Sequence, residues 1–407
     1  MRGKAVLLTL APMIALFVWS CSEQTKSPLA PVGDTPVGGT VDRTDQGSTG
    51  GTDATKETDV PGGTETGSAY AYFPGSIDPD IFPMRLIVSG GPPKDGIPAL
   101  TNPEFVTSSE ASYLRENDLV LGVSINGVAK AYPENMGWWH EIINDQVGDQ
   151  AISMTFCPLT GTGLNFGAES GDGQFELGVS GLLYNSNLVM YDRRDDETLY
   201  PQMYFTAVNG TYKGDVLRLL PVVETTWATW KRLYPETLVI SDDTGYGRDY
   251  TRYPYGGYRQ DHFSLLFPLT PSPRQNPALS QLELKDKVLG VRLNDHPKAY
   301  PFNNMGDRAV INDHVGGTDL VVVWYEEGQL AIPYDRQVGD RTLSFDIETS
   351  TGGFPFNMRD RETGSLWNIK GEAIEGELKG KRLNQIPAHT AFWFAWGTFW
   401  METEVWP

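Results

Sequence analysis

Apolar and polar residues alternate in short runs through much of the chain after residue 119. Residues 120–125 and 128–132 are two such runs, and Asn126 and Gly127 stand between them. An Asn-Gly pair in this setting is a strong signal for a tight β-hairpin, because both central residues of the turn need positive φ. Residues 151–156 form a third alternating run. The pattern therefore predicts short antiparallel strands joined by tight turns.

The same pattern returns later in the chain at a nearly constant spacing. Asn294 and Asp295 stand 168 positions after Asn126 and Gly127, and the spacing is 166 positions further downstream. Matching blocks are Lys130-Ala131-Tyr132-Pro133 with Lys298-Ala299-Tyr300-Pro301, Ile143-Asn144-Asp145 with Ile311-Asn312-Asp313, Leu199-Tyr200 with Leu366-Trp367, and Leu217, Pro221, Trp227 and Trp230 with Leu383, Pro387, Trp393 and Trp396. This recurrence predicts two tandem copies of one unit.

Aromatic residues at helical spacing close each copy. Trp227 and Trp230 are three positions apart and therefore share one helical face, where core packing is the simplest role. We predict helices at residues 226–234 and 390–401, terminal strands at residues 237–241 and 403–406, and a short helix at residues 109–116. The expected fold class is β-rich α+β, with two tandem copies of a unit of several short antiparallel strands plus one aromatic-rich helix.

The N-terminus carries an export signal. A basic start, Met1-Arg2-Gly3-Lys4, precedes an apolar run over residues 5–18, which is shorter than the roughly 20 residues of a membrane span and is typical of a signal peptide. Ser20 precedes Cys21 as in a bacterial lipobox, although Trp19 is unusual there. We therefore predict a lipoprotein signal peptide over residues 1–21 and an exported protein anchored in the cell envelope through lipid on Cys21. An ordinary signal peptide with an incidental cysteine is the alternative.

Composition divides the rest of the chain. Residues 22–69 are rich in Gly, Thr, Pro and Asp and contain no aromatic residue, which predicts a disordered linker. Residues 70–241 then hold an N-terminal segment and the first copy, residues 242–287 an aromatic-rich connection, and residues 288–407 the second copy. The chain of 407 residues has a formal charge of −20 and no basic stripe, which argues against nucleic acid as a partner. No sequence signal indicates oligomerisation.

One thiol and one imidazole stand out in the first copy. The chain has two cysteines, and with Cys21 assigned to lipid, Cys157 remains as a single thiol without a disulfide partner. Alternation places Cys157 with Thr155 on the face opposite the apolar residues, toward a polar side or a pocket. His140 lies upstream, and a hairpin between the two residues makes their proximity plausible.

A cysteine–histidine pair supports two kinds of chemistry. His140 could serve as the base for a Cys157 nucleophile, with the backbone N–H groups of residues 160–163 as an oxyanion hole. The pair could instead bind Cu or Zn, the metals that such ligands favour, although two ligands are too few for a structural site. Inert packing of a lone cysteine and a lone histidine is the plain alternative.

Further polar residues of the first copy could line the same pocket. The candidate ligand-binding residues are Glu141, Thr160, Thr162, Asn185, Asn187 and Asp192. The Asn residues could equally form a turn, and Asp192 could belong to an exposed strand end.

The second copy lacks the candidate chemistry. Arg308 stands opposite His140, and Tyr325 stands opposite Cys157, whereas the turn residues and glycines are kept. We therefore expect one functional copy and one degenerate copy.

From about residue 70 onward the chain resembles the bacterial family catalogued as domain of unknown function 3179. The motifs that carry the resemblance are LVLGVSINGVAKAYP (119–133), WHEIIND (139–145), CPLTGT (157–162), SGLLYNSNLVMYDR (180–193), RDYTRYPYGGY (248–258) and IPAHTAFWFAWGTF (386–399). The resemblance implies an exported or envelope protein without an established activity. Members commonly carry CPLCGT, and Thr160 stands here in place of the second cysteine, so no Cys-x-x-Cys pair is present.

Three functions remain open from the sequence. The first is a membrane-tethered envelope protein that binds a small ligand or a soft metal around His140 and Cys157. The second is a thiol-dependent hydrolase or transferase that uses Cys157 as nucleophile and His140 as base. The third is a non-catalytic envelope scaffold.

Overall fold

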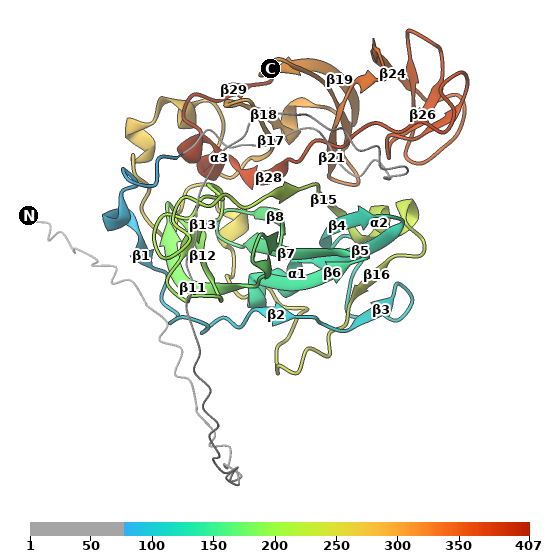
Figure 1. Ribbon diagram of the computed structural model, residues 1–407. Helices are drawn as coiled ribbons and strands as arrows, with labels where there is room; N and C mark the ends of the chain where they lie inside the picture. Colours follow the sequence, from blue (N-terminus) through green and yellow to red (C-terminus); the bar gives the residue numbers. More distant parts are fainter. Residues whose placement is uncertain (1–76) are drawn as a thin grey trace, which may run out of the picture. The chain divides into compact units, whose positions relative to one another are not determined.

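A computed structural model describes residues 77–407 of the chain. The expected signal peptide, the lipid-anchor residue Cys21 and the expected linker lie outside these residues. In the part that the structure describes, no helix has both the length and the apolar character to cross a membrane. Short strands are the predominant regular elements of the described residues, as a β-rich α+β fold requires (Figure 1).

Two five-stranded sheets form the centre of the first half, which we define as residues 88–241. One sheet has the order β15-β4-β5-β16-β3 and the other β14-β8-β7-β6-β2. The strands of the first sheet are β15 (Val223–Thr226), β4 (Leu119–Ile125), β5 (Val128–Pro133), β16 (Leu238–Ile240) and β3 (Phe105–Thr107). Those of the second are β14 (Leu219–Leu220), β8 (Thr162–Gly167), β7 (Gln150–Cys157), β6 (Ile142–Val147) and β2 (Leu100–Thr101).

A third sheet and a small hairpin complete this half. The sheet has the order β1-β11-β12-β13. Its strands are β1 (Val88–Ser89), β11 (Leu177–Tyr184), β12 (Asn187–Asp192) and β13 (Leu199–Pro201), and the hairpin joins β9 (Glu169–Ser170) to β10 (Gly173–Gln174).

The second half, residues 287–407, contains three principal sheets and one small hairpin. The sheet orders are β28-β17-β18-β29, β19-β20-β21 and β24-β25-β26-β27. The strands are β17 (Lys287–Leu293), β18 (His296–Pro301), β19 (Arg308–Val315), β20 (Thr318–Tyr325), β21 (Leu330–Asp335), β22 (Gln337–Val338), β23 (Arg341–Thr342), β24 (Phe345–Glu348), β25 (Asn357–Asp360), β26 (Leu366–Asn368), β27 (Ala373–Glu375), β28 (His389–Phe392) and β29 (Glu404–Val405).

The pairing scheme of the first half recurs in the second. The β4–β5 hairpin pairs antiparallel with β15 and parallel with β16, and the β17–β18 hairpin pairs with β28 and β29 in the same two ways. Both hairpins turn through two residues with positive φ, Asn126 and Gly127 in one and Asn294 and Asp295 in the other. The expected hairpins are therefore confirmed, with the backbone conformation that the turn residues favour.

One α-helix of each half packs a tryptophan over the strand that starts its hairpin. These helices are α2 (Trp227–Leu233) and α3 (Trp393–Phe399). A Cβ added to Gly122 would lie 2.3 Å from the Trp230 ring, and one added to Gly290 would lie 2.0 Å from the Trp396 ring. The indole N–H groups of the two tryptophans donate to Thr237 and Thr403, each at 2.8 Å.

Two helix predictions need correction. Residues 109–116 form turns, and the helix expected there is wrong, because the Glu110 carboxylate accepts from the backbone and hydroxyl of Thr107 and closes a local turn instead. The helix expected from residue 390 begins only at Trp393, because residues 389–392 pair with β17 as β28. The sequence pattern did not predict α1 (Glu134–His140), which directly follows β5.

The two halves meet along β15 and β28, which lie between them in Figure 1. The backbone N–H of Thr226 donates to Gly328 at 2.9 Å, and that of Phe392 donates to Thr160 at 2.8 Å. The first bond runs from the first half to the second, and the other runs in the opposite direction. Each half therefore both donates and accepts a backbone hydrogen bond across the boundary between the halves.

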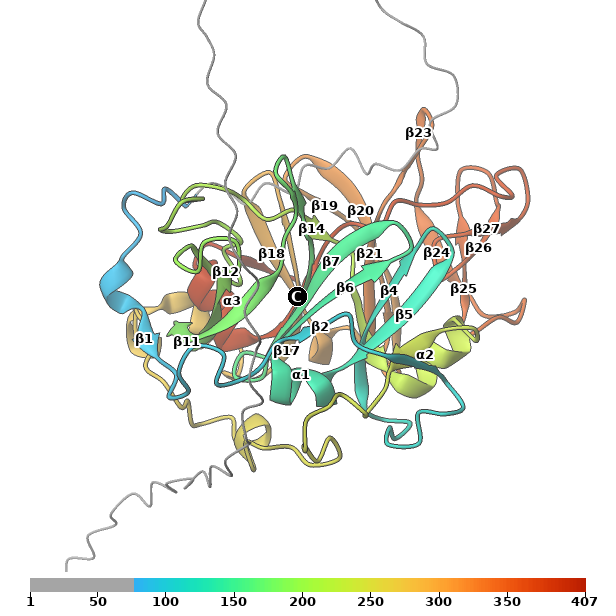
Figure 2. The same ribbon diagram turned by 60° about the horizontal axis from the view of Figure 1, so that its bottom comes forward.

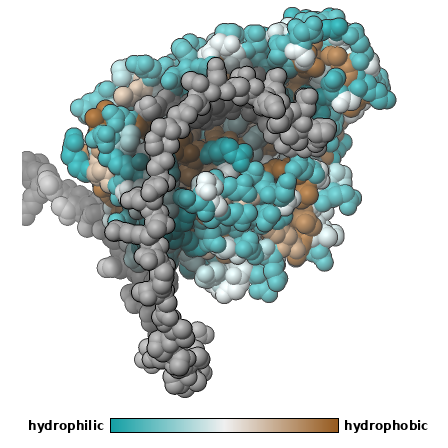
Figure 3. Space-filling view, in the orientation of Figure 1, coloured by the Kyte–Doolittle hydropathy of each residue, from teal (hydrophilic) through white to brown (hydrophobic). Residues whose placement is uncertain are grey.

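The connection between the halves, residues 242–286, runs alongside α1 (Figure 2). It contains three single-turn 3₁₀ helices, Tyr258–Gln260, Pro273–Gln275 and Pro277–Ser280. The Asn135 amide of α1 donates to the Tyr250 carbonyl at 2.9 Å. The face in Figure 3 is mostly hydrophilic, as the net charge of −20 predicts.

Candidate functional site

Cys157 is the last residue of β7 and is almost fully buried, with 1% of its surface exposed. Its thiol donates to the Ser186 carbonyl at a sulfur–oxygen distance of 3.7 Å. Ser186 and Asn185 both have positive φ and form the tight turn between β11 and β12, which directs that carbonyl at the sulfur. The thiol is therefore enclosed and has a polar neighbour.

The chemistry of the thiol follows from this enclosure. Burial, with a smaller contribution from the Glu141 carboxyl, raises the pKa of Cys157 to about 11, against the effect of hydrogen bonds from Thr160. Activated thiols instead have a pKa lowered by adjacent positive charge or a helix N-terminus. At neutral pH Cys157 is consequently a neutral thiol.

His140 ends α1, and both of its ring nitrogens have partners. Nδ1 lies 2.8 Å from the Pro98 carbonyl and Nε2 lies 2.7 Å from the Tyr250 hydroxyl. Because a carbonyl only accepts, Nδ1 carries the proton and Nε2 accepts from Tyr250. Burial, with a smaller contribution from the positive charge of Arg248, lowers the pKa of His140 to about 4 against the effect of the Pro98 hydrogen bond, so the ring is neutral at pH 7. Of the described residues, Pro98 and Tyr250 are its hydrogen-bond partners, and Cys157 is not.

The strand register explains why His140 and Cys157 are not joined. In the second half β19 begins at Arg308, which pairs directly with Tyr325 across the ladder. In the first half β6 begins only at Ile142, since α1 continues to His140 and Glu141 turns the chain with a φ of 57°. His140 therefore belongs to α1 and not to the β6–β7 ladder. In that ladder its position would lie opposite Cys157, as Arg308 lies opposite Tyr325.

A buried network of side-chain hydrogen bonds lies next to Cys157. The Asn187 amide donates to Thr160 at 3.0 Å and to Thr162 at 3.1 Å. Gln202 accepts from Asn187 at 2.7 Å and donates to Thr155 at 2.8 Å. All five side chains are buried, and each has a partner inside the network. Three of the sequence candidates, Thr160, Thr162 and Asn187, are therefore brought together.

Gln202 is the member of this network that the sequence reasoning missed. A signal was present, because Gln202 follows Leu199-Tyr200-Pro201 where the second half has Ile369 after Leu366-Trp367-Asn368. A polar residue in one half at a position that is apolar in the other marks a buried polar group.

The loop after Cys157 is closed from both sides. The Thr160 N–H donates back to the Cys157 carbonyl at 3.3 Å, and the Thr160 carbonyl accepts from Phe392. A Cβ added to Gly161 would lie 3.2 Å from the Phe392 ring. The loop proposed as an oxyanion hole is thus packed against the second half.

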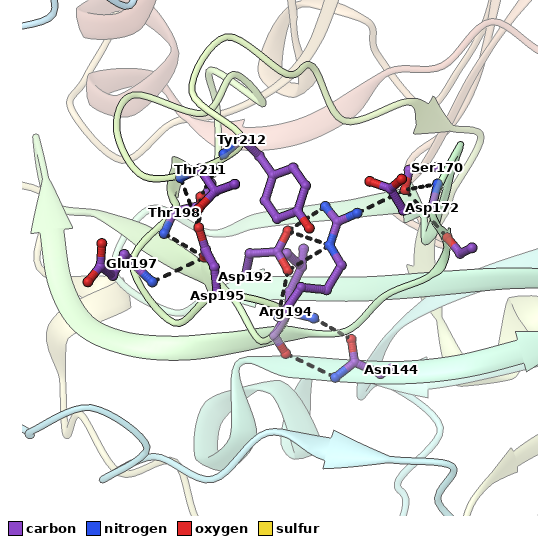
Figure 4. A network of polar contacts seen from close by, with 12 residues as sticks. Asn144, Ser170, Asp172, Asp192, Arg194, Asp195, Glu197, Thr198, Thr211 and Tyr212 are labelled. Carbon is purple, nitrogen blue, oxygen red and sulfur yellow. Dashed lines mark hydrogen bonds and ion pairs between the residues drawn. The ribbon is translucent and has the colours of Figure 1, made fainter. Parts of the chain in front are cut away.

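Asn185 and Asp192 serve local structure. The Asn185 side chain exchanges two hydrogen bonds with the backbone of Thr270, at 2.8 and 3.1 Å, and so fixes the connection to the β11–β12 turn. Asp192 forms an ion pair with Arg194 at 2.7 Å, and the Arg194 guanidinium lies over the Tyr212 ring (Figure 4). The structure places neither side chain in contact with Cys157.

Glu141 is the candidate that lies beside the thiol. Only 7% of the residue is exposed, and burial raises the pKa of its carboxyl to about 8. Among residues 77–407 the carboxyl has neither a hydrogen bond nor an ion pair. A buried polar group without a partner costs folding free energy, and such groups occur mainly where a protein needs them.

Tyrosines of the connection cover the same place. Burial raises the pKa of three tyrosine hydroxyls of the connection, those of Tyr253, Tyr255 and Tyr258. The negative charge of an ionised Cys157 adds a smaller increase to each pKa. The Tyr258 hydroxyl donates to the Leu159 carbonyl at 2.9 Å, whereas the buried Tyr253 hydroxyl has no partner in the described part of the chain. The Glu141 carboxyl and the three tyrosine hydroxyls are therefore the titratable groups that interact electrostatically with the thiol.

A second buried group of charges lies where the halves meet. Lys287 forms an ion pair with Glu224 at 2.5 Å, and Thr390 donates to the same carboxylate. Burial and the charge of Glu224 raise the pKa of Glu134, the first residue of α1, against the effects of Lys287 and Arg259. Arg259 also stacks on Tyr253 at 4.6 Å, which links this group to the tyrosine cover.

Potential metal ligands gather elsewhere. Within residues 77–407, three such ligand atoms come within 4.8 Å of one another at His262, Glu283 and Asp286. Neither His140 nor Cys157 belongs to that group. A metal at Cys157 would therefore have fewer than three protein ligands in the arrangement described here.

Comparison with known proteins identifies the family. No curated protein and no solved structure matches the chain. The family described as "Protein of unknown function (DUF3179)" matches residues 94–403, which is most of the chain. The chain belongs to this family.

Proposed function

We propose that the protein binds a small polar ligand at a first-half site formed by Cys157, Glu141 and the tyrosines of the connection. One observation carries the proposal: the Glu141 carboxyl, next to the buried thiol, is buried and has no hydrogen-bond or ion-pair partner among residues 77–407. At neutral pH that carboxyl keeps its proton, so it can both donate and accept a hydrogen bond. A ligand that supplies the missing partner would recover the cost of burying it.

The surroundings favour binding over nucleophilic catalysis. A thiol with a pKa of about 11 and an imidazole with a pKa of about 4 are both neutral, and His140 is already bonded to Tyr250. A hydrolase or transferase at this site would need the imidazole to leave Tyr250 and reach the sulfur.

A soft metal is a second candidate for the same place. Cys157 would supply sulfur and Glu141 an oxygen, and bound metal deprotonates a coordinating thiol. The small-ligand proposal is preferred because two protein ligands are few for Cu or Zn.

Metal analysis and thiol labelling of the full chain test these proposals together. For the small-ligand site, we expect no stoichiometric Cu or Zn that depends on Cys157 and very slow labelling of Cys157 at pH 7. At alkaline pH, where the Glu141 carboxyl is ionised, we expect faster labelling in Glu141→Gln than in the wild type. Cys157→Ser supplies the blank, and Glu402→Gln, an exposed acid outside the site, is the matched control. Stoichiometric metal that disappears in Cys157→Ser would replace the small ligand by a metal. Labelling with an apparent pKa well below 8.5 would favour the nucleophile.

We further propose that this site belongs to an envelope protein tethered through Cys21. Support comes from the basic start, the short apolar run and the Ser20-Cys21 pair. Radioactive palmitate supplied to the cells is expected to label the wild-type protein and not Cys21→Ser. A wild-type protein that carries no label would refute the lipid tether.

We also propose that the two halves descend from one duplicated unit. The recurring residue blocks, the recurring strand registers and the two glycine–tryptophan contacts support this origin. Matched substitutions in the two halves, described in the Discussion, test it.

A further inference from the structure

Three side chains of types that bind metal ions lie together at the end of the connection. His262 comes from the middle of the connection, and Glu283 and Asp286 lie just before β17. One ligand atom of each side chain comes within 4.8 Å of the other two. Imidazole and carboxylate groups are both ligands of Zn²⁺. An ion could reach them, because Glu283 is exposed and the other two residues are half-buried.

The imidazole of His262 lies beside Glu283 without a hydrogen bond to it. Nδ1 of His262 is 3.2 Å from Oε2 of Glu283, which is close enough for an ion pair. This buried nitrogen nevertheless has no hydrogen bond within residues 77–407. Two atoms that bind one zinc ion at about 2.0–2.2 Å lie roughly 3.2–3.6 Å apart in a tetrahedral site. The separation of Nδ1 and Oε2 therefore suits two ligands of one ion.

The first half shows which part of this cluster belongs to the shared scaffold. Asp118 and Asp286 stand 168 positions apart, and each accepts from the backbone N–H three positions earlier, at 2.9 and 3.0 Å. Each also accepts from an asparagine amide, that of Asn135 at 3.3 Å and that of Asn303 at 3.2 Å. A carboxylate has about four acceptor positions. The Asp286 carboxylate is therefore fixed in place and can still accept a metal ion.

Glu283 is the residue that distinguishes this cluster from the first half. It stands 168 positions after Arg115, so a negative side chain takes the place of a positive one. Within residues 77–407, neither Glu283 nor Asp286 forms an ion pair with a lysine or an arginine. Two carboxylates at this distance repel each other, and a bound cation removes that repulsion.

Lys285 lies between the two acids in the sequence but does not neutralise them. Its ammonium donates to the carbonyls of Tyr258 and Asp261, the second at 2.7 Å. It also lies over the Tyr258 ring, 3.4 Å from the centroid. These contacts hold residue 261, and with it the adjacent His262, next to residues 283–286. The imidazole is thus positioned by a buried contact that does not depend on its own ion pair.

We propose that His262, Glu283 and Asp286 bind one Zn²⁺ ion, with water in the fourth position. One nitrogen and two oxygen ligands in a partly exposed place match the zinc sites that have three protein ligands and one open position. The imidazole ligand favours Zn²⁺ over Ca²⁺ and Mg²⁺. The ion joins the middle of the connection to its end, and its site shares no ligand with the site around Cys157.

A zinc titration of the full chain by isothermal calorimetry tests the proposal. After treatment with a chelator and dialysis, the protein is expected to bind one Zn²⁺ at this cluster, and an excess of Mg²⁺ should not displace it. His262→Ala and Glu283→Gln should each weaken binding by about tenfold or more, because each removes one of three ligands. Glu283→Arg introduces the residue of the first half and should abolish binding. Circular dichroism verifies that each variant is folded.

Two further variants locate the ion. His296→Ala removes an exposed histidine at the start of β18 and should leave zinc binding unchanged. Zinc that is lost in Cys157→Ser would place the metal at Cys157 and overturn the proposal. Absence of stoichiometric zinc binding would also overturn it, as would binding that keeps its affinity in both His262→Ala and Glu283→Arg.

Discussion

In the first half, the space between β7, β8 and β12 holds Thr155, Thr162 and Gln202 in one hydrogen-bonded network. At the corresponding positions the second half has Val323, Leu330 and Ile369, all buried and apolar. The ladders around the two spaces have the same strand order and equivalent registers.

The two halves also differ where the β4–β5 and β17–β18 hairpins end. The first continues into α1, which carries Glu134 and His140, whereas the second continues into the short 3₁₀ helix η5 (Phe302–Asn304). Both halves thus have the same strand pairing and the same glycine–tryptophan contact around different interior residues. A buried polar group that is present in one half only is therefore not required by the strand pairing, and it indicates a function or a network that must be replaced as a whole.

Matched glycine substitutions should produce the largest effects and should be equal in the two halves. A Cβ at Gly122 or Gly290 would overlap the Trp230 or Trp396 ring, so Gly122→Ala and Gly290→Ala should each lower the free energy of unfolding by more than about 3 kcal/mol. Urea unfolding measures this. Gly247→Ala, where no atom lies within 4 Å of the added Cβ, is the control. A large cost in one half alone would contradict the shared scaffold.

A histidine of the second half should make folding acid-sensitive. His389 is buried without a hydrogen bond to either ring nitrogen in the described residues, and burial lowers its pKa to about 3. The unfolded chain takes up the proton below its ordinary pKa of 6.5 and the folded chain does not, so stability is lost as pH falls from 6.5 toward 3. The first half has Val223 at this position.

His389→Val should therefore stabilise the protein at pH 4 by about 3 kcal/mol relative to pH 7. Unfolding curves recorded at both pH values check this. An equal effect at pH 4 and pH 7 would show that protonation of His389 is not involved.

Exchange of one residue tests the contrast between the polar and apolar interiors. Gln202→Ile removes the partner of Thr155, Thr162 and Asn187 and should cost about 2 kcal/mol. Adding Thr155→Val and Thr162→Leu, the residues of the second half, should recover part of this loss. Ile369→Gln is the reciprocal control and should cost a similar amount, because its new amide has no partner. If the additional changes destabilise further, the network cannot be replaced in this way.

The sequence revealed the parts of the fold that are decided locally. Asn126-Gly127 dictates a turn by its backbone preference, and Trp227 with Trp230 marks a helix by spacing, so β4, β5 and α2 could be predicted. Residues 109–116 failed because a single Glu110 contact favoured a turn over a helix.

The arrangement of the site depended on distant contacts and could not be predicted. Both ring nitrogens of His140 are hydrogen-bonded to residues that are distant in sequence, Pro98 and Tyr250. The sequence does not reveal these contacts, and it therefore could not show that His140 would bond to them and not to Cys157. Gln202 directly follows β13, which belongs to a different sheet from β7 and β8, so its contact with Thr155 depends on how the two sheets pack. Glu141 was identified as a candidate, but its isolation becomes visible only when its neighbours are known.

Glu141→Gln should give the smallest effect on stability near pH 5 and the most informative one at alkaline pH. The folded chain keeps the Glu141 proton up to a pKa of about 8, while the unfolded chain loses it near 4.5, so wild-type stability is lost as pH rises between these values. The variant lacks this term, and the cost of burying its amide does not change with pH, so its stability relative to the wild type should rise by about 3 kcal/mol between pH 5 and pH 8. Because the Glu141 carboxyl also raises the pKa of Cys157, the thiol of the variant should be labelled faster at alkaline pH. The second half has Ala309 at this position, so no second-half residue supplies a matching effect. A variant that is less stable than the wild type at pH 8 would mean that the carboxyl already has a partner, and the polar space beside Cys157 would then hold no place for a ligand.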